Sequence, residues 1–163
     1  MLFLLTLIIS LIVASLVGHL GHWALHQRWT WVLHRAHMDH HLTQYPPGKL
    51  TSDRYRFPKW YNNGLLLFTP PLLVLMGSAA LIVWSLHWPW WMLAVLGTCV
   101  ATLGFLNDWV HDSFHVRRHP LMHLRTYQKL RRLHFIHHSN MDKNFGIVSF
   151  VWDRVFGTLV TEK

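Results

Sequence analysis

Long uncharged apolar segments alternate along the chain with charged, histidine-rich segments. Three apolar segments have the length of a membrane-spanning helix, and they run over residues 2–23, 64–86 and 88–110. A helix needs roughly 20 apolar residues to cross the hydrocarbon core of a bilayer. The pattern therefore predicts an all-α integral membrane protein with three transmembrane helices. The second and third helices are joined by a tight hairpin at HWPWW, where Pro89 interrupts the helix and Trp side chains form an interfacial belt.

The positions of the charged residues predict how these helices are oriented. All fifteen Lys and Arg residues fall within two stretches, 28–59 and 117–163. Because an even number of spans separates the segment 27–63 from the tail 111–163, both lie on the same side of the membrane. The positive-inside rule assigns that side to the cytoplasm. We therefore expect a single domain, residues 1–163, whose two His-rich segments form a helical cytoplasmic cap.

Composition narrows the class of protein further. Hydrophobic residues make up 52% of the chain and charged residues only 13%, about half their share in a soluble domain. This apolar content excludes a disordered chain, and the single Cys excludes a disulfide scaffold. The net charge of +8 is confined to the segments beside the predicted spans, so we assign it to topology and lipid contact rather than to nucleic acid. The N-terminal span lacks a basic region and a small-residue cleavage site, so we expect it to be uncleaved.

Fourteen of the fifteen His residues lie at or beyond the predicted cytoplasmic ends of the spans. Ten follow the spacings HxxxH and HxxHH, each present once in both cytoplasmic regions. Residues three or four apart share a helix face, so we expect all three His of each HxxHH to converge on one metal site. Neutral imidazole is the commonest metal ligand in proteins, and ten imidazoles are enough for two ions. The candidate ligands are His22, His26, His37, His40, His41, His111, His115, His134, His137 and His138.

The remaining histidines carry weaker signals. His87 lies beside the Trp belt at the far side of the membrane, and we assign it no metal role. His19, His34, His119 and His123 stay open as additional ligands. Acidic residues next to the array could orient the second ring nitrogen of a ligand, as is common around metals. These residues are Asp39, Asp108 and Asp112.

The ordered motifs HWALH, HMDHH, HDSFH and HFIHH resemble the histidine boxes of the membrane fatty acid hydroxylase and sterol desaturase superfamily. The C-terminal NFGIVSFVWDRVFGT is similar to that family's closing signature. Its matching residues are Asn144, Gly146, Trp152, Asp153, Arg154, Phe156, Gly157 and Thr158. Beta-carotene hydroxylases are similar in size and His order, but we do not expect the WDRVFGT ending in them. A carotenoid-type hydroxylase is therefore the nearest alternative.

The resemblance implies a non-haem di-iron oxidoreductase. The ten patterned histidines would hold two iron ions, with zinc as a substitute, and O2 would be the co-substrate. The reaction would hydroxylate or desaturate an unactivated C–H bond of a lipid, such as a fatty acyl chain, a sterol or a related isoprenoid. The chain has neither a GxGxxG motif nor a cysteine cluster, so we expect electrons from a separate ferredoxin- or cytochrome-type protein. A bacterial inner membrane is favoured over an endoplasmic reticulum.

Other classes of protein fit the histidine pattern less well. A His-ligated haem cytochrome usually has its ligands inside the spans, but the second span and the core of the third contain no His. A metal transporter needs polar ligands near the membrane midplane, and none are evident. A zinc hydrolase would need a carboxylate base such as that of HExxH, which the sequence lacks. The haem cytochrome and the transporter remain as lesser alternatives.

Overall fold

The computed structural model describes residues 1–56 and 64–161, with side chains for 1–56 and 72–161. Residues 57–63 of the predicted loop and 162–163 of the tail lie outside the described residues. The described part is mostly helical and contains no strand beyond an isolated bridge between Ser52 and Val116. The all-α prediction is therefore confirmed for this part of the chain.

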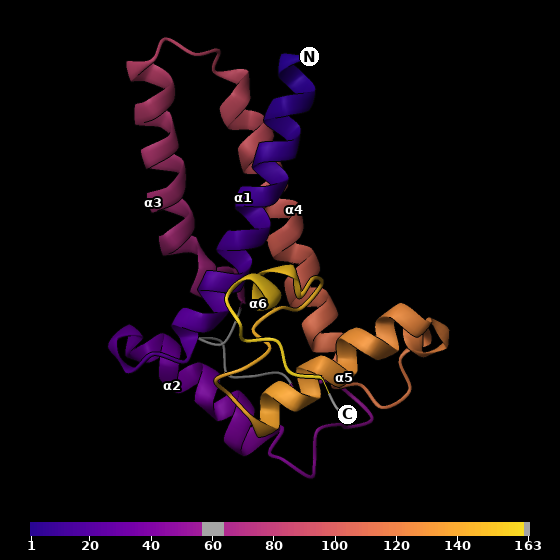
Figure 1. Ribbon diagram of the computed structural model, residues 1–163. Coiled ribbons are helices and arrows are strands. Elements are labelled where there is room, and N and C mark those ends of the chain that lie inside the picture. Colours follow the sequence, from indigo (N-terminus) through magenta and orange to yellow (C-terminus); the bar gives the residue numbers. More distant parts are fainter. Residues whose placement is uncertain (57–63, 162–163) are drawn as a thin grey trace.

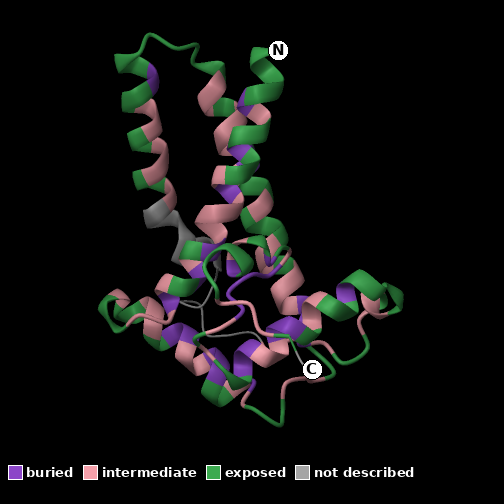
Figure 2. Ribbon diagram, viewed as in Figure 1, coloured by how far each residue is buried: buried purple, intermediate pink, exposed green. Residues whose placement is uncertain are grey.

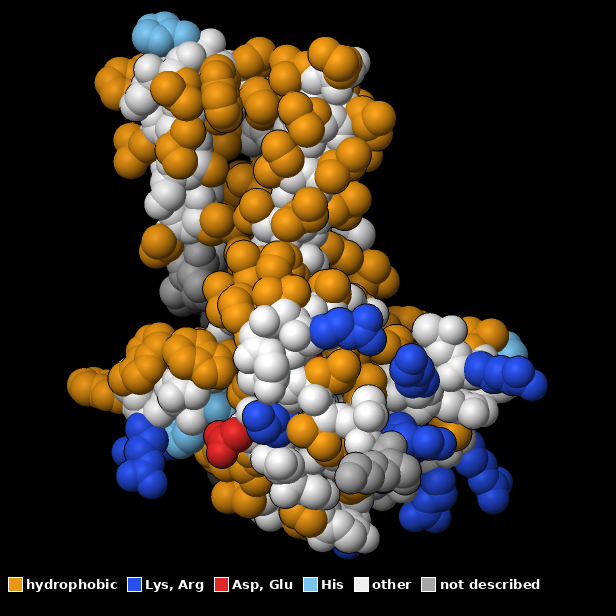
Figure 3. All heavy atoms as spheres, in the orientation of Figure 1, with side chains coloured by type: hydrophobic (Ala, Val, Ile, Leu, Met, Phe, Trp, Pro, Cys, Tyr) orange, Lys and Arg blue, Asp and Glu red, His pale blue; other side chains and the backbone are white. Residues whose placement is uncertain are grey.

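Three long helices form one end of the molecule (Figure 1). They are α1 (Leu2–Leu25), α3 (Gly64–Ser85) and α4 (Trp91–Phe114). Helix α1 packs along α4, and α3 packs against α4. Both α1 and α4 have 24 residues, a length of about 36 Å at 1.5 Å per residue, and both are apolar enough to cross a membrane. Apolar side chains predominate on the face of this end that Figure 3 shows.

The second predicted span, residues 64–86, corresponds to α3. This helix has 22 residues, but the portion with described side chains, Leu72–Ser85, is shorter than a membrane span. In the described part of the chain, two helices are thus long and apolar enough to span a membrane where three were predicted, and the span at α3 stays a prediction. Helix α4 also continues to Phe114 instead of ending at residue 110. Its last turn carries His111, which lies in the cap with other histidines.

Two belts of exposed Trp side chains mark the ends of this helical region. One lies at the predicted hairpin, where His87 adopts a left-handed φ of 54° and Pro89 separates α3 from α4. The other includes Trp23 and Trp109, both exposed near the C-terminal ends of their helices. Trp91 and Trp109 are eighteen residues apart on α4, or about 27 Å. This separation is close to the ~30 Å thickness of a hydrocarbon core, with Trp at both interfaces.

The shorter helices form a cap at the opposite end from the hairpin (Figure 1). They are η1 (Arg28–Thr30), α2 (Val32–Asp39), the π-helical turn η2 (His40–Gln44), η4 (Pro120–His123), α5 (Arg125–Ser139) and α6 (Val151–Val155). Buried residues concentrate where these elements meet the lower ends of α1 and α4 (Figure 2). An apolar cluster of Phe114, Tyr127 and Ile147 joins α4, α5 and the tail. Buried histidines line much of the remaining cap interior.

Candidate metal centre

Ten imidazoles gather inside the cap in two groups of five. In each group, the nitrogen atoms that face one another all lie within 4.8 Å. Group one consists of His22, His26, His37, His41 and His137, and group two consists of His40, His111, His115, His134 and His138. These are the ten histidines singled out by spacing in the sequence.

Each group is built from two pairs of histidines four residues apart and one histidine that crosses from the other half of the chain. In group one, α1 supplies one pair and α2 with η2 supplies the second. In group two, the pairs come from α4 with its C-cap and from α5. The crossing residues are His137 in group one and His40 in group two. The expectation that the three His of each HxxHH converge on one site is therefore wrong.

Helix geometry explains the separation. Residues four apart lie nearly above one another on a helix, whereas adjacent residues point about 100° apart. His37 and His41 therefore share a group, while His40 turns toward the other. A π-helical turn begins at His40, whose carbonyl accepts a hydrogen bond of 2.9 Å from the amide of Tyr45. Turns of this kind are rare and occur frequently at functional sites.

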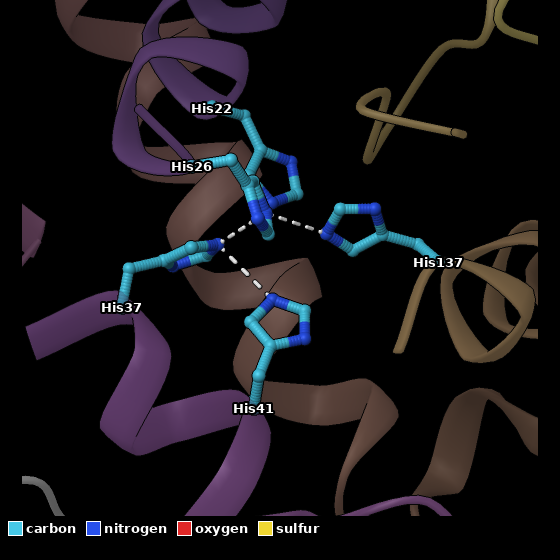
Figure 4. A group of neighbouring side chains, drawn as sticks. All are labelled: His22, His26, His37, His41 and His137. Atoms are coloured by element: carbon cyan, nitrogen blue, oxygen red, sulfur yellow. Dashed lines mark hydrogen bonds between the residues drawn. The ribbon is translucent and has the colours of Figure 1, made fainter. Parts of the chain in front are cut away.

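The imidazoles of group one face a common centre (Figure 4). His26 Nε2 lies 3.0 Å from His137 Nε2 and 2.9 Å from His37 Nε2. His37 Nε2 also lies 3.1 Å from His41 Nε2. The Nε2 atom of His22 is buried without a hydrogen-bond partner among the described residues.

Group two is packed in the same way. His134 Nε2 lies 3.1 Å from both His115 Nε2 and His138 Nε2. The Nε2 atoms of His40 and His111 are buried and have no hydrogen-bond partner in the described part of the chain. Both groups thus direct several ring nitrogens at a small shared volume.

Backbone carbonyls hold the second ring nitrogen of several of these residues. In group one, Nδ1 of His22 lies 2.6 Å from the carbonyl oxygen of Phe145, and Nδ1 of His137 lies 2.6 Å from that of Lys143. Each carbonyl can only accept, so each Nδ1 carries the proton and donates it. The Nε2 atoms of His22 and His137 are therefore unprotonated, and each carries a free lone pair.

A different loop supports group two. The Nδ1 atoms of His115 and His138 donate to the carbonyl oxygens of Leu50, at 2.8 Å, and Tyr45, at 2.9 Å. The Tyr45 ring, fully buried, also stacks on His115 with a centroid distance of 4.0 Å. The loop that follows η2 thus fixes two rings of this group.

The sequence indicated that nearby carboxylates could do this work, but among the grouped histidines of the described residues such a contact is seen only at His111. Asp112 lies 3.4 Å from Nδ1 of His111, but Asp39 accepts a hydrogen bond from Gln44 instead. The supporting atoms are main-chain oxygens of the segments that follow η2 and α5. Main-chain carbonyls carry no residue-specific signature, so residue types alone could not reveal them.

The proton arrangement in group two shows that the site fits a cation. His115 and His138 each give their one proton to a carbonyl, so both present lone pairs to His134 Nε2. A neutral imidazole carries one proton and can satisfy only one of these two lone pairs. A metal ion accepts several such lone pairs at once. Nitrogen-rich donor sets of this kind suit first-row transition metals such as iron and zinc.

Burial favours the neutral form of several of these imidazoles. It lowers the pKa of His41, His134 and His137 well below the ordinary value, and neighbouring imidazoles lower it further. Burial, with a smaller contribution from His34, lowers the pKa of His26 to about 4. Burial, with His111, lowers that of His138 to about 3. At pH 7 these five rings are therefore in the form that coordinates metals.

A fully buried carboxylate, Asp153, organises the tail beside group one. Its Oδ1 accepts from the amide of Phe145 and the hydroxyl of Thr158, both at 2.7 Å, and its Oδ2 accepts from the amide of Gly146 at 2.8 Å. Burial alone would raise the pKa of Asp153, but these contacts and one with His19 hold it below its ordinary value. A structural role for Asp153 was not predicted from the sequence.

Two other residues of the C-terminal signature close the same loop. Asn144 has a left-handed φ of 57°, accepts from the amide of Val160 at 2.7 Å and donates to its carbonyl at 2.8 Å. A Cβ atom at Gly146 would collide with the carbonyl oxygen of Ser149 and lie 2.8 Å from Asp153 Oδ2. Only glycine fits this position without a shift of the backbone.

The histidines left open by the sequence lie outside both groups. His19 Nδ1 is 3.5 Å from Asp153, so this residue packs against the tail although it shares a helix face with His22. His34 Nδ1 bonds to the carbonyl of Leu25 at 3.0 Å. His119 and His123 lie at η4, where their Nδ1 atoms contact backbone groups.

Comparison with known proteins extends the assignment beyond geometry. The sequence model of fatty acid hydroxylases matches residues 7–158, nearly the whole chain. This chain belongs to the fatty acid hydroxylase family. The resemblance seen in the histidine motifs is thereby confirmed. Family membership and the two long apolar helices indicate a membrane protein.

Two relatives within curated proteins are dihydroceramide fatty acyl 2-hydroxylases of Arabidopsis thaliana. One is 42% identical over 62 residues, which cover 37% of this chain and 26% of the relative. The other is 36% identical over 107 residues, which cover 60% of this chain and 40% of the relative. The chain thus matches less than half the length of each. No solved structure matches it.

Proposed function

We propose that this protein is an O2-dependent hydroxylase that inserts oxygen into a C–H bond of a fatty acyl chain in a membrane lipid. The observation that carries the proposal is the pair of five-imidazole groups at the ends of two apolar helices. Membership of the fatty acid hydroxylase family and relatives named as fatty acyl 2-hydroxylases support it.

The proposed cofactor is a pair of iron ions, with zinc as a substitute that binds the same imidazoles. Group one and group two would each hold one ion through neutral ring nitrogens. Iron bound there would supply the oxidation of an unactivated C–H bond by O2. The protein's own contribution is to fix the rings through main-chain carbonyls and to exclude bulk water from them. Eight of the ten side chains are at most 7% exposed.

The position of the groups favours a carbon near the polar end of the acyl chain. His22 and His26 lie at the last turn and C-cap of α1, and His111 lies on the last turn of α4. These ends coincide with one of the two Trp belts and hence with a membrane interface. The carboxyl end of an acyl chain lies at that level, whereas its methyl end lies near the midplane. Hydroxylation at carbon 2, the position named for the relatives, fits this placement.

The lesser alternatives suit this arrangement less well. A haem takes two axial ligands, and each group offers five imidazoles. A transport site would lie near the membrane midplane, whereas both groups lie in the cap. Desaturation of the acyl chain and attack on a sterol or carotenoid are kept as outcomes of the experiment described below.

Isotope labelling tests the proposed reaction. The purified protein in lipid vesicles is supplied with a chemical reductant or a ferredoxin, 18O2 and a ceramide or phospholipid, and the acyl chains are analysed by mass spectrometry. We expect an 18O-labelled hydroxyl at carbon 2, and no product from His41→Ala. An alkene without added oxygen would favour a desaturase. A labelled sterol or carotenoid with an unlabelled acyl chain would contradict the substrate assignment.

We further propose that α3 crosses the membrane and that the cap faces the cytoplasm. The one-sided distribution of Lys and Arg supports this topology. Single cysteines at Trp88 and Lys49, introduced into a Cys99→Ser background, report it through an impermeant thiol reagent. We expect external labelling at position 88 and none at position 49 in intact cells. Strong external labelling at position 49 would contradict the topology.

An electron donor is proposed to dock on α5. Arg125, Lys129 and Arg132 are exposed on one face of this helix, and none forms an ion pair among the described residues. The same helix carries His134 and His138 of group two on its buried side. An acidic ferredoxin- or cytochrome-type protein fits such a surface, and charge steering weakens with salt. Donor-supported turnover should fall as salt rises, whereas turnover with a small neutral reductant should not.

A further inference from the structure

The tail that follows α5 contacts group one from two directions. The carbonyl of Phe145 holds His22, which comes from α1, and the carbonyl of Lys143 holds His137, which comes from α5. The edge of the Phe145 ring also packs on His26, with a centroid distance of 5.7 Å. Group two receives its carbonyl contacts from the 45–50 loop instead. The position of the tail therefore affects the orientation of the group-one rings and not of the group-two rings.

The Phe145 residue is fixed at both ends of its backbone. Its carbonyl accepts the proton of His22 Nδ1, and its amide donates to Asp153 Oδ1 at 2.7 Å. The backbone of Phe145 thus links the buried carboxylate of Asp153 to the His22 ring of group one. The amide of Gly146 holds the other carboxylate oxygen at 2.8 Å, so the carboxylate fixes two successive peptide units.

No Lys or Arg side chain forms an ion pair with Asp153 in the described part of the chain. The carboxylate is held by backbone amides, by Thr158 Oγ1 and by the ring of His19 at 3.5 Å. His19 lies one helical turn before His22 on α1, so the same contact links the carboxylate to the helix that carries two group-one rings. An asparagine cannot replace this residue. Both oxygens of Asp153 accept hydrogen bonds, so the amide nitrogen of an asparagine would face an N–H or O–H donor in place of one of them.

We propose that Asp153 is a positioning residue for group one: through the amides of Phe145 and Gly146 it holds the Phe145 carbonyl against His22, so that the tail sets the metal affinity of group one and leaves that of group two unchanged. The inference rests on the proposed function, because it requires that both groups bind metal. Asp153 acts through the main chain and not as a ligand, since it is absent from both sets of facing nitrogens. Loss of such indirect support typically weakens metal binding about 10- to 100-fold.

Metal titration tests the proposal. The full-length protein in detergent is stripped of metal and titrated with Zn2+, and bound ions per chain are counted by native mass spectrometry. We expect two tightly bound ions in the unsubstituted protein. In Asp153→Asn, one ion should bind unchanged and the other about 10- to 100-fold more weakly. Arg154→Gln, an exposed neighbour, is the matched control and should bind both ions normally.

Combination with ligand variants identifies the affected group. Asp153→Asn with His41→Ala removes support and ligand from the same group, so one ion should still bind tightly. Asp153→Asn with His40→Ala affects both groups, so no ion should bind tightly. Equal weakening of both ions by Asp153→Asn alone, or no weakening, would overturn the positioning role. Fewer than two ions in the unsubstituted protein would overturn the proposed function instead.

A milder variant serves if Asp153→Asn does not fold. Thr158→Val removes one hydrogen bond of 2.7 Å to Asp153 Oδ1 and leaves the carboxylate in place. It should weaken the group-one ion less than Asp153→Asn, and leave the group-two ion unchanged. An effect of Thr158→Val confined to the group-two ion would contradict the proposal.

Discussion

The two imidazole groups have the same plan but different supports. Each has two pairs of His spaced four apart and one His from the other half of the chain. Group one relies on carbonyls of the tail at 143–145, tied down by Asp153. Group two relies on carbonyls of the 45–50 loop, and on the Tyr45 ring stacked against His115. Helices therefore supply the ligands in both groups, and separate loops adjust each one.

The largest effects should come from pairs of ligand substitutions. His41→Ala with His137→Ala removes two members of group one, and we expect one ion to remain bound. His41→Ala with His138→Ala removes one member of each group, and we expect no tightly bound ion. Neither double variant should turn over substrate. Metal content per chain, measured after membrane insertion is verified, checks both results; the reverse pattern would contradict the crossing of His137.

The next largest effect is expected from a substitution at Gly146, which should weaken metal binding in group one and not in group two. In Gly146→Ala, the new methyl group would collide with the Ser149 carbonyl and displace the tail. Overpacking of this kind costs about 1–3 kcal/mol of folding free energy. We expect reduced thermal stability and weak binding of the group-one ion. Gly104→Ala is the control, because a Cβ at Gly104 meets nothing within 4 Å; equal loss in both variants would remove the specific role of the tail.

Tyr45 offers the corresponding test of group two. Tyr45→Ala removes the ring that stacks on His115, and we expect the group-two ion to bind about 10-fold more weakly or worse. Tyr45→Phe keeps the ring and loses only the hydroxyl that accepts from the Arg56 amide at 2.7 Å, a cost of about 1 kcal/mol. Zn2+ titration of both variants measures the difference. A weaker group-one ion in Tyr45→Ala would contradict the separation of supports.

Acid should destabilise both groups of the metal-free protein. Burial lowers the pKa of His26 in group one to about 4 and that of His138 in group two to about 3, against 6.5 for the unfolded chain. Between the folded-state pKa values and 6.5, the unfolded chain binds more protons than the folded chain. The free energy of unfolding is therefore full above pH 6.5 and falls progressively toward pH 4. Thermal melts from pH 7.5 to pH 4.5 check this; a stability that rises on acidification would contradict the buried neutral rings.

The smallest effect is expected at His87. This residue lies at the hairpin between α3 and α4, at the opposite end of the molecule from both groups. We expect His87→Ala to keep two ions and most of its activity. Loss of one ion in this variant would show that the hairpin influences the cap.

The sequence was informative where a property repeats with helical periodicity. The apolar runs predicted α1 to within two residues, and spacing predicted all ten grouped histidines. Sequence spacing did not predict how His40 and His41 divide between groups, because this depends on how α2 is rotated against helices far along the chain. The roles of the Phe145 and Lys143 carbonyls were equally hidden, since every residue has a carbonyl. His19 has the spacing of a ligand but faces Asp153 instead.

The crossing histidines also determine how the chain must close on itself. The contact between His26 and His137 joins residues 111 positions apart, and bringing such distant segments together costs conformational entropy that grows with the logarithm of loop length. His137 is covalently adjacent to His138, as His40 is to His41. Once group one is assembled, the partners of group two are already close, so most of this entropy is lost only once. Neither half of the chain, cut between α3 and α4, contains a complete group, so we expect the two sites to assemble together.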